Sequence, residues 1–586
     1  MKKTNKFLFL FAAAVLISGN VAAQEFDDFG GDSFESDSFG SGSSSSLEAG
    51  ATVSTEVRGY VGDLFWIENP KGSDVSLMAL PKAVISLKYN GSKSDVELKL
   101  RGDEDIIKNH PVDVIDELVL RGYFGNLTAE AGKMKVVWGK GDKLHVIDNF
   151  NSDDYTDFII PDYLDRRIST PMLRAVYSMP FANMNIEAVY TPLLPTDRFA
   201  ANGRWAPAQV SALTDSVTSL AKARVAASTE RLEKARTEAN QAATLKAMVD
   251  AGDTGTAKTT LSSMVTSALS NGKISYTTEE VVAVLVQQGK NPATATAEDR
   301  EAAAAIVLSP KYAAYLESEL TAAETEYTLA LANANTLSAN PNAIYPNLWT
   351  LQYGQFGGRA TWTMGQLDMG VSYYNGWYKQ PSVNAEKINT FLNAYLKNGT
   401  VTEEEKFLAY DKKQTFGLEA STVLWHFNLR GEGAFNLTDD TDGTNPWIHN
   451  NSISWLGGFD IDLPFWNANL NVQEYGTYIL HGSDCDTNAV NHYADVDYSK
   501  KGVYSNNKTA VNFTTSFLNG KVAPEVTFIY GIEYGDFIAM PKIIYKPADG
   551  LSFTATGMVI VTKDNDSEFA AWKKNSFASI SAEYKF

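Results

Sequence analysis

The chain has 586 residues, a net charge of −20 at pH 7 and one cysteine, Cys485. The negative charge argues against nucleic-acid binding, because phosphate groups would be repelled. A single cysteine excludes an intramolecular disulfide framework and a metal site built from several cysteines. We expect neither a nucleic-acid partner nor a cofactor.

Residues 1–23 have the pattern of a cleavable signal peptide: early lysines, an apolar run over residues 7–17 and small residues up to Ala23. That run is too short to span a bilayer, and no later stretch approaches the ~18–20 uninterrupted apolar residues of a membrane helix. A membrane-inserted chain must then be a closed barrel, whereas a soluble secreted all-β protein is the alternative. Residues 24–46 are rich in Ser, Gly and Asp, which predicts a disordered acidic periplasmic leader.

From residue 47 onward, apolar and polar residues alternate in segments of roughly ten residues, the pattern of a transmembrane barrel. We expect an all-β, antiparallel transmembrane barrel of about 18 strands, with strands one to seven in residues 47–205 and strands eight to eighteen in residues 342–586. The predicted strands are 47–60, 82–90, 95–101, 116–124, 127–138, 170–178, 184–192, 352–364, 367–375, 414–424, 427–437, 450–463, 468–480, 507–517, 522–531, 536–546, 551–561 and 576–586.

The connections between these strands alternate between short turns and long polar loops, with one exception near residues 531–535. Outer-membrane barrels place short turns in the periplasm and long loops outside, so the alternation favours a membrane barrel over a soluble sandwich. Lys133 and Lys135 fall on the nominal lipid face of the fifth strand, where a central cation would cost roughly 2–4 kcal/mol. Either a bulge re-aims these lysines or they lie at the outer interface.

Residues 206–341 are rich in alanine and poor in aromatics. Apolar residues recur there every three or four positions, as in Val210, Leu213 and Val217, which predicts helices. Thr277 and Glu280 have the spacing of a capping box. We expect two long antiparallel helices with shorter helices between them, forming an insertion in one external loop.

The last residues of the chain alternate up to the final position. Ala578, Ile580, Ala582, Tyr584 and Phe586 share one face, and polar residues fill the other. This ending resembles that of Gram-negative outer-membrane β-barrels, in which the final strand and its terminal Phe are read by the barrel assembly machinery. The resemblance implies an outer-membrane location, a lipid environment and that machinery as a partner.

A second resemblance covers about residues 130–178. A strand that begins Gly132-Lys133 leads to Val137-Trp138-Gly139 and then to a run rich in Asn and Asp, with Asp148, Asn149, Asn151 and Asp153. In order and character this resembles the post-strand loop of large Gram-negative outer-membrane channels of the porin type. The resemblance implies a channel but names no solute.

This connection is also the third external loop, which in porin-like barrels often folds inward and narrows the pore. Inward folding would set carboxylates against basic groups across an aperture and screen solutes by charge; the acidic excess would favour cations or neutral polar solutes. The alternative is an exposed acidic loop with scattered ion pairs. The candidate constriction residues are Asp142, Asp148, Asp153, Asp154, Asp157, Asp162, Asp165, Lys140, Lys143, Arg166 and Arg167.

The polar faces of the predicted strands carry charges of both signs, which suit a water-filled lumen and would be costly against lipid. They could form a track for solutes or a network of ion pairs that satisfy one another. The candidate lumen charges are Arg58, Glu97, Arg101, Arg121, Arg174, Arg359, Arg430 and Glu432.

Enzymatic and metal-binding patterns are weak. His481, Asp484, Asp486 and His492 lie in one external loop without an accompanying hydrolase motif. The acidic run at 439–443 fails the register of a calcium loop. We therefore expect no enzyme, and two functions remain: a porin-like channel for small polar solutes, or a surface adhesin or antigen whose residues 206–341 bind a host or matrix ligand.

Overall fold

A computed structural model describes residues 46–62, 76–142, 144–483, 503–565 and 567–586. The expected signal peptide, the leader up to residue 45, Lys143, Cys485 and the loop residues Asp484, Asp486 and His492 lie outside the described residues. The chain divides into two compact units. The barrel unit contains residues up to 211, 347–384 and 408–586, and the helical unit contains residues 212–346 and 385–407.

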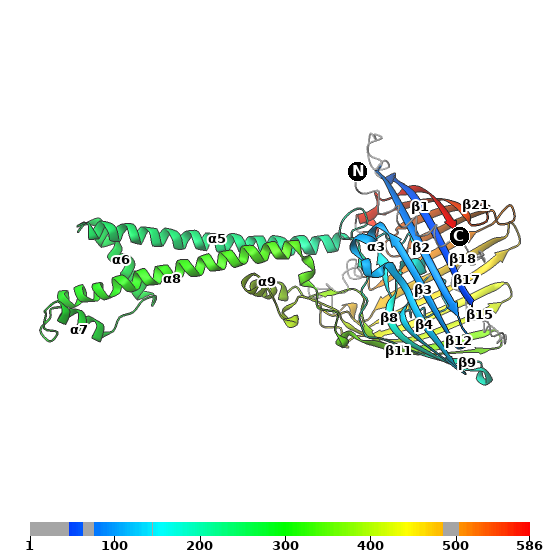
Figure 1. The fold of residues 1–586 in the computed structure, drawn as a ribbon, viewed down its shortest axis with the longest axis horizontal. Helices are drawn as coiled ribbons and strands as arrows, with labels where there is room; N and C mark the ends of the chain where they lie inside the picture. Colours follow the sequence, from blue (N-terminus) through cyan, green and yellow to red (C-terminus); the bar gives the residue numbers. More distant parts are fainter. Residues whose placement is uncertain (1–45, 63–75, 143, 484–502, 566) are drawn as a thin grey trace. The chain divides into compact units, whose positions relative to one another are not determined.

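The barrel is one closed antiparallel sheet of 18 strands, as predicted (Figure 1). Each strand pairs with its neighbours in the chain, and β1 pairs with β23 to close the ring, with Tyr60 opposite Phe577. The strands are β1 (Ser46–Tyr60), β2 (Ser76–Asn90), β3 (Ser94–Asp103), β4 (Ile115–Phe124), β5 (Leu127–Met134), β8 (Thr170–Met179), β9 (Met184–Thr191), β11 (Gln355–Met364), β12 (Leu367–Trp377), β15 (Lys412–Leu424), β16 (Phe427–Leu437), β17 (Ser452–Leu463), β18 (Ala468–Ile479), β19 (Ser505–Thr514), β20 (Val522–Gly531), β21 (Phe537–Ala548), β22 (Leu551–Val561) and β23 (Phe577–Lys585).

The barrel buries polar side chains and exposes apolar ones. Along β15, Phe416 and Leu418 are 47% and 63% exposed, whereas Thr415 and Glu419 are 2% and 5% exposed. A strand alternates its side chains between the two faces of the sheet, so the large apolar residues form the outside of the ring and the polar ones fill its inside. An apolar exterior of this kind is matched to lipid rather than water.

The turns sort to one end of the barrel as predicted. The short connections, such as those at Gly125 and Gly365, link β4 to β5 and β11 to β12, and exposed aromatics mark this end: Phe181 is 89% exposed and Trp425 is 84% exposed. Such rings prefer the membrane–water interface. The long connections lie at the other end, together with the short connection 532–536.

The fifth strand ends at Met134, four residues earlier than predicted. Gly132 has φ +147°, and a Cβ there would lie 1.9 Å from the Leu118 carbonyl oxygen, so only glycine fits at this position. Just after it, Lys133 pairs with Asp113 at 2.8 Å and Lys135 pairs with Asp116 at 3.1 Å. Both lysines are therefore neutralised at the end of the strand instead of facing lipid unpaired.

The helical unit is built from α5 (Ala208–Asp250), α6 (Thr256–Ser270), α7 (Thr278–Gln287), α8 (Ala297–Ala339) and α9 (Lys387–Asn398). Ion pairs join α5 to α8, including Arg236 to Glu324 at 3.2 Å. The predicted capping box of Thr277 and Glu280 is present at the start of α7. Helix α9 comes from the connection between β12 and β15 and is absent from the predicted elements; it packs against α8, where Asn333 donates a hydrogen bond to the Leu396 carbonyl at 3.0 Å.

Among the described residues, no helix combines the length and the apolar character needed to cross a membrane.

Candidate functional site

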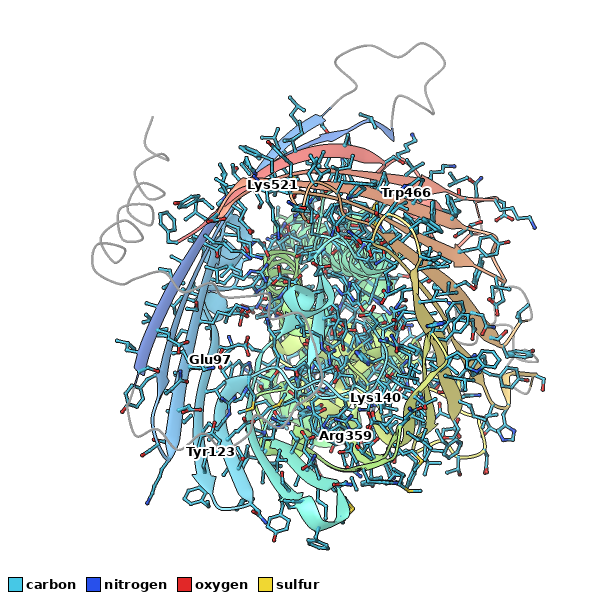
Figure 2. All side chains as sticks on the ribbon, turned by 90° about the vertical axis from the view of Figure 1, so that its right-hand side faces the viewer. Glu97, Tyr123, Lys140, Arg359, Trp466 and Lys521 are labelled. Atoms are coloured by element: carbon cyan, nitrogen blue, oxygen red, sulfur yellow. The ribbon has the colours of Figure 1, made fainter. Side chains whose placement is uncertain are left out.

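The connection between β5 and β8, residues 135–169, folds into the barrel; we call it the inner loop. It contains β6 (Ser152–Tyr155), α4 (Tyr163–Arg166) and β7 (Arg167–Ile168). Trp138 and Phe150 are fully buried, their ring centroids lie 5.0 Å apart, and Phe150 packs edge-on against Tyr374 of β12 at 5.3 Å. Contacts with inward-facing side chains of β12, β16 and β18 place this loop in the lumen, and Figure 2 shows Lys140 of the loop inside the ring of strands.

Two glycines of the barrel wall make room for the inner loop. A Cβ on Gly357 of β11 would lie 2.6 Å from the Tyr373 carbonyl oxygen and 3.0 Å from the rings of Trp138 and Phe150. A Cβ on Gly417 of β15 would lie 2.2 Å from the Ser372 hydroxyl and 2.8 Å from a methyl group of Ile147. A larger residue at either glycine would therefore crowd both the neighbouring strand β12 and the loop.

Glu432 of β16 holds the first part of the inner loop. Its side chain is fully buried, and its carboxylate accepts hydrogen bonds from the backbone N–H groups of Lys140, Gly141 and Val146 at 2.7–2.8 Å. The Nδ1 atom of His145 lies 2.9 Å from the same carboxylate. Next to this anchor, the carboxylate of Asp142 accepts from Asn471 of β18 at 3.1 Å.

Two further ion pairs fix the loop to the strands near the barrel closure. The Arg58 guanidinium of β1 binds the Asp157 carboxylate through two contacts, at 2.6 and 3.0 Å. Lys82 of β2 pairs with Asp165 at 2.8 Å, and Arg101 of β3 donates to the Asp165 carbonyl at 2.9 Å. Burial alone would raise the pKa of Asp165, but attraction to Lys82 and Arg101 lowers it to about 2.

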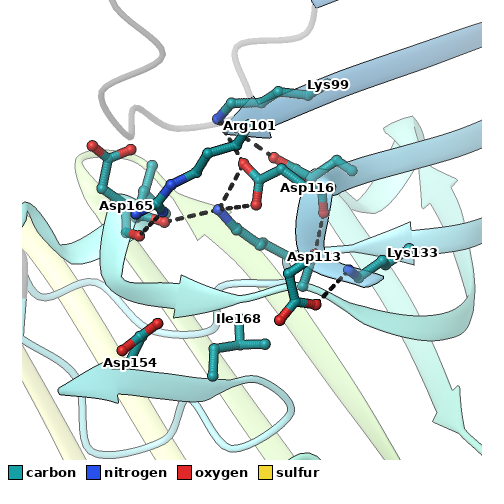
Figure 3. A network of polar contacts seen from close by, with 12 residues as sticks. Lys99, Arg101, Asp113, Asp116, Lys133, Asp154, Asp165 and Ile168 are labelled. Carbon is teal, nitrogen blue, oxygen red and sulfur yellow. Dashed lines mark hydrogen bonds and ion pairs between the residues drawn. The ribbon is translucent and has the colours of Figure 1, made fainter. Parts of the chain in front are cut away.

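Figure 3 shows the surrounding network at the long-loop end of the barrel. The Asp116 carboxylate forms ion pairs with Lys135 at 3.1 Å and with Lys99 at 3.3 Å. Lys135 also donates to the Leu164 carbonyl at 3.1 Å, so the start of the inner loop is tied to its end.

The centre of the loop holds a buried cluster of charges. Arg167 pairs with Asp148 at 2.5 Å and with Asp153 at 3.6 Å, and Arg166 lies 3.5 Å from Asp153. Tyr163 donates a hydrogen bond to Asp148. Burial raises the pKa of Asp148 despite the opposing charge of Arg167. The other oxygen of Asp148, Oδ1, accepts no hydrogen bond from the described residues.

The remaining constriction candidates lie at the edges of this cluster. Asp154 pairs with Arg198 at 2.9 Å. Asp162 precedes α4, and its carbonyl accepts from the Arg166 backbone N–H at 2.9 Å. The structure thus brings the described candidates of this set onto one inward-folded loop.

Three of the lumen candidates, Arg121, Arg174 and Arg359, belong to a continuous row of opposite charges across neighbouring strands. Glu130 lies between Arg121 and Arg174, at 2.5 and 2.9 Å. Glu187 continues the row, 2.7 Å from Arg174 and 3.9 Å from Arg359. Figure 2 shows Arg359 inside the ring, where it pairs with Glu419 at 2.6 Å.

The other lumen candidates lie outside this row. Arg430 pairs with Asp460, and Arg101 lies 3.3 Å from Asp103. Glu97 stands opposite Lys88 in the register of β2 and β3. Arg430 therefore has its partner on a neighbouring strand, whereas Arg101 has its partner on its own strand.

Sequence reasoning missed several residues that hold the inner loop. Asp197, Arg198 and Lys379 lie outside the barrel strands and outside the loop, yet they contact its backbone or side chains. Of the weighed catalytic residues only His481 is described, and no group of three or more His, Cys, Asp or Glu side chains in the described ranges is placed to hold a metal ion.

Solved structures with similar folds include a BenF-like porin from Pseudomonas fluorescens Pf-5, OccAB3 from Acinetobacter baumannii and OpdL from Pseudomonas aeruginosa. Sequence identities are 9%, 10% and 7%, and TM-scores are 0.38, 0.37 and 0.36. Each alignment covers 92% of this chain, and 98%, 99% and 98% of the respective structures. No protein-family model and no curated protein matches the chain.

The closed ring, its apolar exterior, its sorted turns and its inward-folded third loop are properties of this chain itself. A closed barrel with an apolar outer band and a charged interior belongs in an outer membrane. The chain is an 18-stranded outer-membrane β-barrel that carries a helical insertion.

Proposed function

We propose that the chain is a channel through which small polar solutes diffuse across the outer membrane. The observation that carries this proposal is the inner loop, whose charged side chains line the inside of a barrel with a polar interior. A loop anchored at several points inside a barrel reduces its free cross-section, and charged groups along such a passage select solutes by charge.

The same residues support a preference for cations or neutral polar solutes. The inner loop contributes seven candidate carboxylates, against the basic side chains of Lys140, Lys143, Arg166 and Arg167. In the wall, the arginines of the charged row are each faced by a glutamate, so they add little net positive charge. A negative excess along a narrow passage raises the local concentration of cations.

Planar-bilayer recording of the folded full-length chain tests this function. We expect discrete conductance steps, and under a salt gradient a reversal potential of the sign produced by cation permeation. Correctly folded protein that inserts but conducts no current would refute the channel.

The size of the helical unit supports a second proposed function. A diffusion channel does not need two 43-residue helices, α5 and α8, in one connection. A surface adhesin or antigen that binds a host or matrix ligand through residues 206–341 would use them. Replacing this segment by a short linker separates the two functions: retained conductance with lost binding to cells or matrix supports the adhesin, and unchanged binding contradicts it.

Assembly forms the third part of the proposal. We infer that the barrel assembly machinery recognises β23 and Phe586. The final strand closes the barrel against β1. The Phe586 backbone N–H donates a hydrogen bond to the Ala51 carbonyl at 2.8 Å, and Phe586 is 39% exposed.

A further inference from the structure

The segment that enters the helical insertion pairs with the inner loop. We call residues 192–205, between β9 and the helix α5, the entry stem; all of it belongs to the barrel unit. Its short strand β10 (Arg198–Phe199) runs parallel to β6 of the inner loop, with Arg198 opposite Asp154 and Phe199 opposite Tyr155. The rings of Tyr155 and Phe199 stack with centroids 5.4 Å apart and an interplanar angle of 14°.

Charged contacts reinforce this pairing. The Arg198 guanidinium bridges Asp154 at 2.9 Å and Asp113 at 2.5 Å. The neighbouring Asp197 carboxylate accepts from the backbone N–H of Asp153 at 3.0 Å and from the side-chain amide of Gln380 at 3.2 Å. The stem is therefore bonded both to the backbone and to the carboxylates of the inner loop.

An aromatic contact closes the stem just before the first long helix. Trp205 stacks on Phe158 of the inner loop with centroids 4.9 Å apart and an interplanar angle of 2°. Its indole N–H donates to the Tyr60 hydroxyl at 3.1 Å, and both stacked rings are buried. Helix α5 begins at Ala208, three residues later, so little free chain separates the helix from this contact.

These contacts enclose the stretch of the loop that carries Asp153, Asp154 and Asp157. On one side of the stretch is the entry stem, and on the other is Arg58 of the barrel wall, which binds Asp157. A displacement of the stem must either break these contacts or move the three carboxylates.

We propose that the entry stem couples the helical insertion to the inner loop, so that a macromolecule bound to the insertion regulates passage through the barrel. The proposal rests on the channel function proposed above. A ligand shifts such an equilibrium only by its differential affinity for the two arrangements of the stem, and the effect is reciprocal between the two sites.

The first test measures how accessible the inner loop is to a reagent in solution, and it does not use conductance. In a Cys485→Ser background, Thr156→Cys reports how fast a charged, membrane-impermeant thiol reagent reaches the loop. Combining Arg198→Gln with Trp205→Ala removes the ion pairs of Arg198 and the stacking of Trp205 on Phe158. The contacts of Asp197 and Phe199 remain, and we expect the rate to rise about tenfold because the loop opens locally. Trp349→Ala is the matched control, since that ring is 79% exposed, and it should leave the rate unchanged. An unchanged rate in the uncoupled variant would overturn the coupling.

The second test attaches a protein, streptavidin, to the helical insertion. A biotin-acceptor peptide placed after Gly272, in the exposed connection between α6 and α7, allows streptavidin to bind from the external side. Streptavidin should change the closing rate of single channels by about twofold or more in the parent chain and not in the uncoupled variant. No change in the parent, or the same change in both, contradicts the proposal.

The two proposals can fail separately. If the parent protein conducts no current, the channel function is refuted, and the coupling is then decided by the Thr156→Cys reaction rate with and without streptavidin. A rate that streptavidin changes only when the stem contacts are intact would support a coupled, non-conducting barrel; a rate indifferent to streptavidin refutes the coupling.

Discussion

Replacing Glu432 by alanine should release the first part of the inner loop from the opposite wall. The substitution removes the acceptor for the backbone N–H groups of Lys140, Gly141 and Val146, and the neighbour of His145. The other anchors, Arg58 with Asp157 and Lys82 with Asp165, are untouched. We therefore expect local detachment of residues near 139–150 rather than unfolding of the barrel.

The magnitude follows from the three backbone hydrogen bonds. Hydrogen bonds to a charged group contribute about 1.5–3 kcal/mol each. When the carboxylate is lost, water in the lumen can hydrogen-bond the freed N–H groups, so the net loss is smaller than the sum of the three. A net loss of about 3–5 kcal/mol raises the detached population by roughly two to four orders of magnitude. A loop that is detached for part of the time leaves a wider passage.

Single-channel recording measures the consequence. Glu432→Ala should show a larger or more variable open current than the parent, and Glu432→Gln should lie between them because its amide oxygen can still accept from Lys140 and Gly141. Glu525→Ala is the control: Glu525 pairs with Lys542 at 2.6 Å in another part of the wall. An open current in Glu432→Ala identical to that of the parent, with the protein folded, would refute the idea that this anchor sets the passage.

Three further predictions test other parts of the account. Gly357→Leu should displace the inner loop and increase the open current, because a Cβ there already meets two rings at 3.0 Å; Gly433→Leu, where no heavy atom lies within 4 Å of the added Cβ, should behave like the parent. The pKa of Asp165 lies below its ordinary value, so its stabilising charge is present at neutral pH and is lost only as the pH falls through about 2. The conductance difference between Asp165→Asn and the parent should consequently be the same at pH 7 and at about pH 3.5, and a difference that disappears at the lower pH contradicts the pairing with Lys82. Deleting Phe586 should lower the yield of heat-modifiable barrel in the outer membrane, and an unchanged yield would exclude its proposed role in assembly.

The strands could be predicted because each strand and turn of the barrel has a recognisable local sequence pattern. Each strand alternates apolar and polar residues, and most of the short turns carry residues such as Gly125 or Gly365 that adopt positive φ. The end of β5 was harder to place, since the alternation continues through Lys133 and Lys135 whereas the strand pairing ends at Met134. Helix α9 had a usable signal that the strand pattern obscured: Phe391, Leu392, Tyr395 and Leu396 lie on one helical face before Gly399, which has φ +74°.

The candidate site was predictable by residue type but not by partner. The acidic run of residues 142–165 marks the inner loop, yet nothing local links it to Glu432, which is almost 300 residues away in sequence. That contact exists only because the sheet curls into a barrel, so that β16, six strands from β5 around the ring, meets the loop inside the lumen. The best signal that sequence reasoning left unused is glycine at inward positions of β11 and β15, at Gly357 and Gly417, where a strand would ordinarily carry a side chain.

The central claim is that the inner loop lies against the opposite wall inside the closed barrel, and a designed disulfide tests it most directly. A Cβ built on Gly417 lies 3.3 Å from the Cβ of Ile147, close to the separation of about 3.5–4.5 Å found in disulfides. The nearest groups to that added Cβ are the Ser372 hydroxyl at 2.2 Å and the Cγ2 methyl of Ile147 at 2.8 Å, which Ser372→Ala and Ile147→Cys remove. In a Cys485→Ser, Ser372→Ala background, the pair Ile147→Cys and Gly417→Cys should cross-link on mild oxidation of the outer-membrane protein, and denaturing electrophoresis should show the shift of a closed internal loop. Two cysteines that stay reduced and equally reactive in the folded barrel would show that the loop does not cross the lumen.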